Sequence, residues 1–500
     1  MKKAMATGER EVNKLCMLAA MLSLISASPA QSGAGIELEA CHIKNHSQEV
    51  LCGTYAVFEN RATAEGRRIE LHFAVIPAID ETVEADPIVV FAGGPGQAAM
   101  DMAPFVRAVF SEVNERRDLV LIDQRGMGAS HPLECDIDED ALPTLDIQEQ
   151  ERRIRELLSE CLQELDADVT LYTQDLANSD IHEILQALGY ERVNIYGGSW
   201  GTRSALLYAH QFPGHVRTLV LDGNLPLANR APSNAAVDAE RALRKLFTGC
   251  SADPDCHRAF PELEEDFREA LDLLGPEGVS VTMDDPTSGE QQTIVLTRDS
   301  FGEVLRSVLY IPELSRVIPL IIQQASQGDY RALQGVAGYL AAGSEGSMTL
   351  GASLTIFCSE ELARLDDGHV DRETTSRLLG HQIMNSLQNA CRVWPRAPLP
   401  EIYKENVGSD APALLLSGEL DPITPPHWGE EMAKALPNSL HLIAAGTGHN
   451  VAPVGCAPEL IHQFIDQGSL EGIDGSCLAE LTRPSFFTHA SGPAVTIDRD

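Results

Sequence analysis

Short apolar runs alternate with helical segments along the first half of the chain. Residues 68–77 alternate apolar and polar side chains as a half-buried strand does, whereas residues 87–94 and 118–126 are apolar runs that end in turns. Later segments continue the alternation: a helical pattern at 181–190, a strand at 192–196, a helix at 202–213 and a strand at 216–223. Strands that alternate with helices predict a mostly parallel sheet covered on both faces.

The strand pattern fades between about residue 225 and residue 403, where helical periodicity dominates, and it returns at 411–425 and 439–450. We therefore expect a mainly helical insertion that interrupts an α/β core. The expected organisation is a signal peptide at 1–30, the first part of the core at 31–224, a helical cap insertion at 225–404, and the second part of the core with a C-terminal tail at 405–500.

The first thirty residues are typical of an export signal. Basic residues precede the apolar run 15–27, and Ala30 follows in a small-residue cleavage pattern. The run is too short to span a bilayer comfortably, and Cys16 precedes the apolar core, so we expect no lipid-anchored cysteine. We expect an exported protein, periplasmic or extracellular, with no stable membrane association after signal removal.

Cysteine usage agrees with an oxidising compartment. Of eleven cysteines, ten remain after Cys16 is removed with the signal, and an even number favours disulfides. Pairing of nearest neighbours, which is one connectivity among several, gives Cys41–Cys52, Cys135–Cys161, Cys250–Cys256, Cys358–Cys391 and Cys456–Cys477. Zinc is the rival interpretation, but no C-x-x-C pair exists and the spacings are irregular, so we expect no metal.

Net charge limits the kinds of binding partner, and chain length limits the domain organisation. The chain has 500 residues and a formal net charge of −37, so a polyanionic partner such as nucleic acid would be repelled. The simplest interpretation of the charge is solubility. The length favours two structural units or one domain with a large insertion.

The segment "NIYGGSWGTR", residues 194–203, places Ser199 between a predicted strand and a predicted helix, with Gly197 and Gly201 two residues away on either side. A G-x-S-x-G turn in this context holds the serine in a strained conformation, where its hydroxyl can attack a carbonyl. The alternative is a glycine-rich connection that contains a serine by chance. The strand–turn–helix context favours a nucleophile.

A serine nucleophile needs a base and an acid that orients it. Asp421 follows the strand at 413–418, and His449 follows the strand at 440–445, so both lie at the same sheet edge as Ser199. The weaker candidates are three: His441 within its strand, His427 as a rival base, and Asp222 as a rival acid. No motif suggests a metal or an organic cofactor.

The segment "FAGGPGQ", residues 91–97, raises two possibilities. It lacks the lysine and hydroxyl residue of a phosphate-binding P-loop, and the spacing is not G-x-G-x-x-G. A loop that stabilises an oxyanion fits better, with the backbone N–H groups of Gly94 and Trp200 as donors and the register between Gly93 and Gly94 left open.

Five motifs in order, "GGPGQ", "DQRGMGAS", "GGSWGT", "GELDPITP" and "GTGH", resemble the α/β-hydrolase peptidases of the prolyl aminopeptidase and tripeptidyl aminopeptidase group. The resemblance covers residues 88–454. It implies an α/β-hydrolase core, a triad of Ser199, Asp421 and His449, and an oxyanion hole at Gly94 and Trp200. Ala92 departs from the family, which often has histidine before these glycines. The cysteine-rich, exported layout is more similar to the tripeptidyl aminopeptidase branch.

The resemblance implies a secreted serine exopeptidase that acts on short peptides from the free amino end. A glutamate of the cap would bind the substrate ammonium, and Glu360 matches better than Glu361; the alternative is that both are solvated helix residues. An esterase with the same triad is the second hypothesis, and a non-catalytic binding protein is the third. Ser199 disfavours epoxide hydrolases and dehalogenases, which need a carboxylate at that position.

Overall fold

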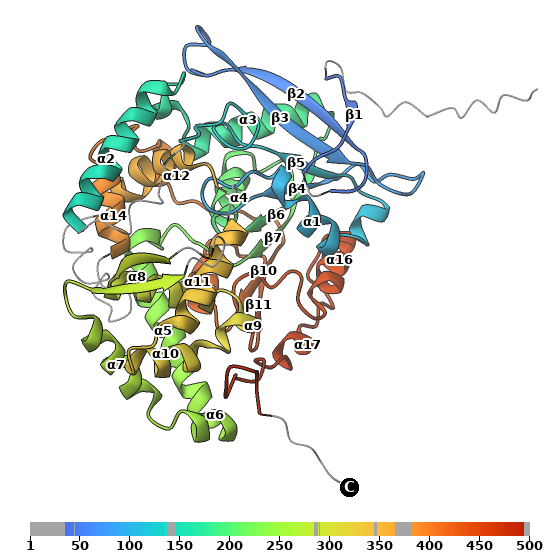
Figure 1. Cartoon of the computed structure of the whole chain (residues 1–500). Coiled ribbons are helices and arrows are strands. Elements are labelled where there is room, and N and C mark those ends of the chain that lie inside the picture. The colour runs from blue at the N-terminus through green and yellow to red at the C-terminus, as the bar shows by residue number, and fades with distance from the viewer. Residues whose placement is uncertain are drawn as a thin grey trace, which may run out of the picture.

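The computed structural model describes residues 36–44, 46–135, 137, 147–284, 289, 291–344, 348–365 and 382–494. The expected signal peptide at 1–30, with Cys16, lies outside the described residues. Figure 1 shows a twisted sheet with helices on both faces and a separate group of helices, α5 to α11, beside it.

Nine strands form the sheet, in the order β1-β2-β3-β5-β4-β6-β7-β10-β11. The strands are β1 (Glu39–Cys41), β2 (Val50–Phe58), β3 (Arg68–Ile76), β4 (Ile88–Phe91), β5 (Leu119–Ile122), β6 (Val193–Gly198), β7 (Val216–Asp222), β10 (Ala413–Gly418) and β11 (Ser439–Ala444). Strands β1 to β3 and the β3–β5 pair are antiparallel, and the pairs from β5 to β11 are parallel. This confirms the predicted α/β-hydrolase class with a mostly parallel sheet.

Each face of the sheet packs against its own helices because successive side chains of a strand point to opposite faces. In β4, Val89 and Phe91 join one apolar cluster, and Ile88 and Val90 join the other. The first cluster includes α3 (Gln174–Ala187), α4 (Trp200–Gln211) and α15 (Pro426–Ala433). The second includes α1 (Ala103–Val109), α16 (Ala457–Gln467) and α17 (Ser476–Ala479). Both strand faces are therefore buried, which explains the continuous apolar runs in the sequence.

The segment between β7 and β10 is mainly helical. Its helices are α5 (Ala231–Ala252), α6 (Pro254–Ala259), α7 (Leu263–Leu274), α8 (Arg298–Leu309), α9 (Pro312–Ser315), α10 (Ile318–Ser326), α11 (Arg331–Ser344), α12 (Leu350–Ile356) and α14 (Gln382–Ala390). The sequence missed one hairpin there, β8 (Val279–Asp284) with β9 (Gln291–Leu296). Helices α5 to α8 and α10 form an apolar cluster of their own, whereas Leu354 and Cys358 pack into the core cluster. The boundaries of the cap remain a prediction.

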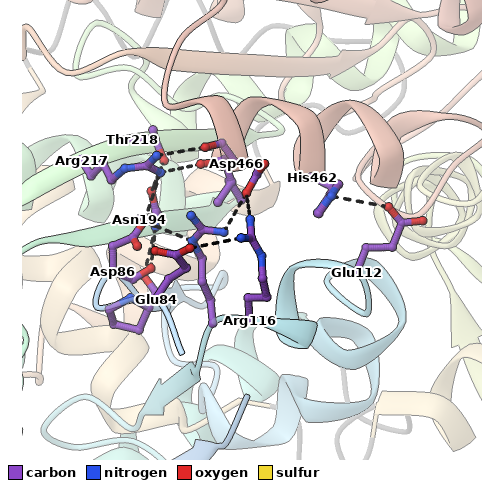
Figure 2. Close-up of polar contacts among 12 residues, drawn as sticks. Glu84, Asp86, Glu112, Arg116, Asn194, Arg217, Thr218, His462 and Asp466 are labelled. Atoms are coloured by element: carbon purple, nitrogen blue, oxygen red, sulfur yellow. Dashed lines mark hydrogen bonds and ion pairs between the residues drawn. The ribbon is translucent and has the colours of Figure 1, made fainter. Parts of the chain in front are cut away.

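A polar network ties the amino ends of the parallel strands together, at the edge opposite the strand ends that carry Ser199 and Asp421 (Figure 2). The Asp86 carboxylate, just before β4, pairs with Arg117 and Arg217, each at 3.1 Å, and accepts a hydrogen bond from Asn194 of β6 at 2.9 Å. Asp466, near the end of α16, pairs with Arg117 at 3.3 Å and with Arg116. The network ties α16 to the amino ends of β4, β5, β6 and β7.

Five disulfides cross-link the chain: Cys41–Cys52, Cys135–Cys161, Cys250–Cys256, Cys358–Cys391 and Cys456–Cys477. They join the same nearest neighbours that the sequence suggested. The largest sequence separation, 33 positions, is that of Cys358–Cys391. Such bridges stabilise a fold chiefly by restricting the unfolded chain.

Candidate active site

Ser199 occupies a sharp turn between the end of β6 and the start of α4. Its φ of 56° and ψ of −119° are unusual for a residue with a side chain, and such backbone costs about 1–3 kcal/mol. The N–H of Ser199 donates to the carbonyl of Asp222 at 2.7 Å, which anchors the turn to β7. The strained turn therefore holds the hydroxyl at the carboxyl end of the sheet.

The glycines on either side of Ser199 are required by close backbone contacts. A β-carbon on Gly197 would lie 2.5 Å from the carbonyl oxygen of Gly201. A β-carbon on Gly201 would lie 2.7 Å from the carbonyl carbon of Phe91 and 2.8 Å from the oxygen of Ala92, both on the neighbouring strand β4 and the loop after it. The G-x-S-x-G pattern is thus a consequence of how closely α4 approaches β4.

Asp421 and His449 form a buried pair at the ends of β10 and β11. The Oδ2 atom of Asp421 lies 2.7 Å from Nδ1 of His449 and 2.7 Å from the hydroxyl of Thr424. The Oδ1 atom accepts from the N–H groups of Ile423 at 2.7 Å and Thr424 at 2.9 Å. Both side chains are almost fully buried, so the imidazole is held in one orientation.

The two pKa values move apart as an ion pair requires. Burial alone would raise the pKa of Asp421, but the positive charge of His449 and the donated hydrogen bonds lower it below its usual value. Burial alone would lower the pKa of His449, but the carboxylate of Asp421, with a smaller contribution from Asp222, raises it. His449 is therefore a stronger base than an exposed histidine.

The rival candidates make other contacts. His441 packs within β11, where its Nε2 lies 2.9 Å from the hydroxyl of Ser417. His427 lies beside Trp428, and burial followed by the charge of Arg241 lowers its pKa to about 4. The carboxylate of Asp222 accepts bonds from the N–H groups of the segment that follows His449, and Asp421 is the carboxylate bonded to the imidazole itself.

Two free backbone N–H groups lie beside Ser199. Within the described residues, no hydrogen-bond acceptor takes the N–H of Gly94 or of Trp200, and both residues line the same cavity as Ser199. The N–H of Gly93 instead donates to the side chain of Gln97 at 3.3 Å. These contacts favour Gly94 over Gly93 as the candidate oxyanion donor, a choice that the sequence left open.

A cavity of about 730 Å³ opens at Ser199, within the usual range for small-ligand sites. Its wall is largely apolar and comes from both the core and the cap. The apolar lining residues are Trp200, Leu225, Ala231, Pro232, Ala235, Val295, Leu350, Leu354, Phe357, Ile383, Leu387, Ala390 and Ile423.

Helix α8 of the cap brings charged side chains to this cavity. Asp299 and Glu303 line it, and Glu303 pairs with Arg306 one turn further along, with Nε and Oε2 2.9 Å apart. Beyond the helix, Tyr310 contacts the loop that carries His449: its carbonyl accepts from the N–H of His449 at 3.3 Å, and its ring meets the imidazole edge-on at 5.3 Å.

Glu360 and Glu361 do not line the cavity that contains Ser199. Glu360 accepts from the backbone N–H of Gln174 at 2.7 Å and from the hydroxyl of Tyr403, and burial raises its pKa to about 7. Glu361 pairs with Arg203 and Arg364. The alternative that both are solvated is wrong, because both side chains are fully buried.

Sequence reasoning missed the partner of Glu361 because it comes from a distant helix. Arg203 stands 158 positions earlier, four residues after Ser199, and its guanidinium lies 4.7 Å from the ring centre of Trp200. Arg203 is the only arginine, lysine, aspartate or glutamate of α4, and that charge was the available signal, since a buried arginine needs a buried acid. In the described ranges, no group of three or more His, Cys, Asp or Glu side chains could hold a metal ion.

Comparison with known proteins shows similarity to α/β-hydrolases and to several peptidases. A model described as "alpha/beta hydrolase fold" matches residues 86–250, and one described as "TAP-like protein" matches residues 376–477. Serine protease Hip1 of Mycobacterium tuberculosis is 24% identical over 89% of this chain and 91% of its own length. Tripeptidyl aminopeptidase of Streptomyces lividans is 28% identical over 39% of each chain, and proline iminopeptidase of Neisseria gonorrhoeae is 31% identical over 27% of this chain and 32% of its own. These similarities show the α/β-hydrolase fold and support a peptidase hydrolase.

Proposed function

We propose that this peptidase is a serine exopeptidase that cleaves short peptides from the free amino end, with Ser199 as nucleophile, His449 as base and Asp421 as the orienting acid. The observation that carries the proposal is Ser199 itself: a strained serine at the wall of a cavity, beside two free N–H groups. The Asp421–His449 pair at the neighbouring strand ends supplies the remaining groups.

The chemistry follows from these positions. The Oγ of Ser199 attacks the scissile carbonyl while His449 takes its proton, and the N–H groups of Gly94 and Trp200 stabilise the oxyanion. The tetrahedral intermediate collapses to an acyl-enzyme, and His449 gives the proton to the leaving amine. A water molecule then attacks the ester, again with His449 as base, and Ser199 regains its proton when the acid product leaves.

The cavity wall suggests what the enzyme accepts. Trp200, Leu354 and Phe357 favour apolar side chains next to the scissile bond. For the substrate ammonium, we replace Glu360 and Glu361, which do not line the cavity, by Asp299 and Glu303, which do. Glu303 already pairs with Arg306 of the same wall, so an ammonium group would share its carboxylate. A carboxylate in a partly desolvated wall is the natural partner of an ammonium group.

The compartment is also part of the proposal. Five disulfides fit folding in an oxidising environment, which together with the N-terminal sequence pattern suggests export to the periplasm or the exterior. Among the described residues, no helix has both the length and the apolar character to cross a membrane.

Hydrolysis of a matched panel tests the proposal. Aminoacyl and tripeptidyl arylamides, each free and N-acetylated, are compared with p-nitrophenyl esters of the same acyl groups. An exopeptidase reads the free amino end, so the free arylamides should turn over at least tenfold faster than the acetylated ones. Turnover of esters alone would establish the esterase alternative, because the acyl chemistry is the same.

Labelling of the nucleophile separates an enzyme from a binding protein. A serine-reactive phosphonate should modify Ser199, and Ser199→Ala should lose several orders of magnitude in kcat. Ser386→Ala is the matched control, since this serine also lines the cavity but lies on α14 of the cap. Undiminished turnover of Ser199→Ala, or labelling at another residue, would overturn the mechanism.

A further inference from the structure

Asp222 is a fully buried carboxylate whose donors include a segment of the active site. Its Oδ1 accepts from the N–H of Val451 at 2.7 Å, and its Oδ2 accepts from the N–H of Ala452 at 2.9 Å and from the hydroxyl of Tyr196 at 3.2 Å. Among the described residues, no lysine or arginine pairs with it. Since an unpaired buried charge is costly, these three donors must hold it.

The same residue also binds the nucleophile turn through its backbone. The carbonyl oxygen of Asp222 accepts from the N–H of Ser199 at 2.7 Å. One residue further, Gly223 has a φ of 73°, and a β-carbon there would lie 3.0 Å from Cε1 of His449 and 3.1 Å from the hydroxyl of Thr424. The end of β7 therefore touches the segments that carry Ser199, Asp421 and His449.

We propose that Asp222 is a positioning residue that holds the Ser199 turn with its carbonyl oxygen and the segment after His449 with its carboxylate. The proposal rests on the triad proposed above. Two bonds to consecutive N–H groups fix the backbone of residues 451–452, two to three positions beyond the base. A misplacement of about 1 Å between reacting groups can lower a rate about 100-fold, so this anchoring has a direct effect on turnover.

The carboxylate also acts on His449 by its charge. The groups that face the imidazole are the carboxylates of Asp421 and Asp222, the hydroxyl of Thr424 and the ring of Tyr310. Asp421 raises the pKa of His449 most, and Asp222 adds to that rise. Burial raises the pKa of Asp222 overall, although its two backbone donors oppose the rise. The donors that its two oxygens accept from fit a carboxylate.

The first test is Asp222→Asn, which keeps the shape and removes the charge. The amide can accept at one oxygen only, so its NH₂ group faces a backbone N–H and the segment moves. We expect kcat to fall about 100-fold with KM changed little, because Asp222 does not line the cavity. The acid limb of the pH profile should move to lower pH, because His449 loses a neighbouring negative charge. Asp222→Ser, which also removes the charge, serves if the Asn variant does not fold.

Control variants distinguish a positioning role of Asp222 from a role as the triad acid and from failure of the proposed function. Asp86→Asn removes a carboxylate from the opposite edge of the same sheet, and it should lower stability while leaving kcat and the acid limb unchanged. Wild-type kcat and an unshifted acid limb in Asp222→Asn, with Ser199→Ala inactive, would overturn the positioning role but not the triad. Inactive Asp222→Asn together with active Asp421→Asn would make Asp222 the triad acid instead. An active Ser199→Ala would reject the proposed function itself.

Discussion

A β-carbon on Gly201 would stand 2.7 Å from the carbonyl carbon of Phe91, so α4 and β4 meet with no room for a side chain. Gly201→Ala should push the start of α4 away from the sheet. The expected loss of stability is about 1–3 kcal/mol, as for other overpacked sites, with a larger loss of activity because the Ser199 turn moves. Denaturant unfolding and kcat of the folded enzyme measure the two effects. Gly214→Ala is the control, since nothing lies within 4 Å of its β-carbon position; equal effects at both positions would contradict this explanation.

The pH dependence follows from the raised pKa of His449. The imidazole must be neutral to take the proton of Ser199, so kcat/KM should rise with pH through a pKa above the usual value of about 6.5. An N-acetylated ester is the right substrate, because it has no amino group that titrates nearby. Asp421→Asn should lower kcat by about four orders of magnitude, since the imidazole loses its orienting partner. An acid limb at or below pH 6.5 in the wild-type enzyme would argue against the ion pair.

Glu303→Gln tests how the amino end is bound. The change removes a negative charge from the cavity wall and leaves Arg306 without its acidic partner, although Arg306 still donates to the hydroxyl of Tyr310, so the wall becomes more positive. We expect kcat/KM for free-amino arylamides to fall about tenfold or more, and hydrolysis of acetylated esters to be preserved. Glu313→Gln, an exposed change outside the cavity, should affect neither substrate.

The Glu360→Gln variant tests whether Glu303, as proposed here, or Glu360, as the sequence suggested, binds the substrate ammonium. Because Glu360 is buried against Tyr403, its loss should lower stability and affect both substrate types equally. A selective loss on free-amino substrates in Glu360→Gln, with none in Glu303→Gln, would restore Glu360 as the ammonium-binding residue.

Acid stability should depend on the network in Figure 2. Burial is the largest single effect and raises the pKa of Asp466, but the bonds and charges of Arg117 and Arg116 together lower it overall. A carboxylate with a lowered pKa stabilises the fold above its unfolded pKa, about 3.9, and that contribution disappears as pH falls through the folded value. Asp466→Asn should therefore cost up to about 1 kcal/mol at pH 7, since the side chain is 40% exposed, and less at pH 3. The exposed Asp410→Asn, measured by the same thermal unfolding, should show no such difference.

The core of the fold could be predicted because local patterns determine it. The inner parallel strands, such as β10, are buried on both faces and read as apolar runs, whereas the edge strand β11 is only partly buried. Asp421 and His449 lie in the loops that follow β10 and β11. The sequence did not predict strand β2, because Gly53 interrupts its apolar pattern. A β-carbon at Gly53 would lie 3.0 Å from the side chain of Leu38. The partners of Glu360 and Glu361 could not be read from sequence, because they are set by the packing of α4 and residues near 403 against the π-helical segment Phe357–Glu361.

The contact between Tyr310 and the histidine loop limits how this enzyme can be re-engineered. A β-carbon on Gly448 would stand 2.5 Å from the carbonyl oxygen of Tyr310, so the loop and the chain after α8 are fitted to each other. Exchanging the whole segment between β7 and β10 for that of another hydrolase would remove the cap side of the cavity wall. It would also remove the contact of Tyr310 with the loop that carries His449. In a chimera designed to change substrate choice, His449 would thus be held less firmly in place. Substrate selectivity is better changed by point substitutions on the cavity-facing side of α8 and α12 than by replacing the whole segment between β7 and β10.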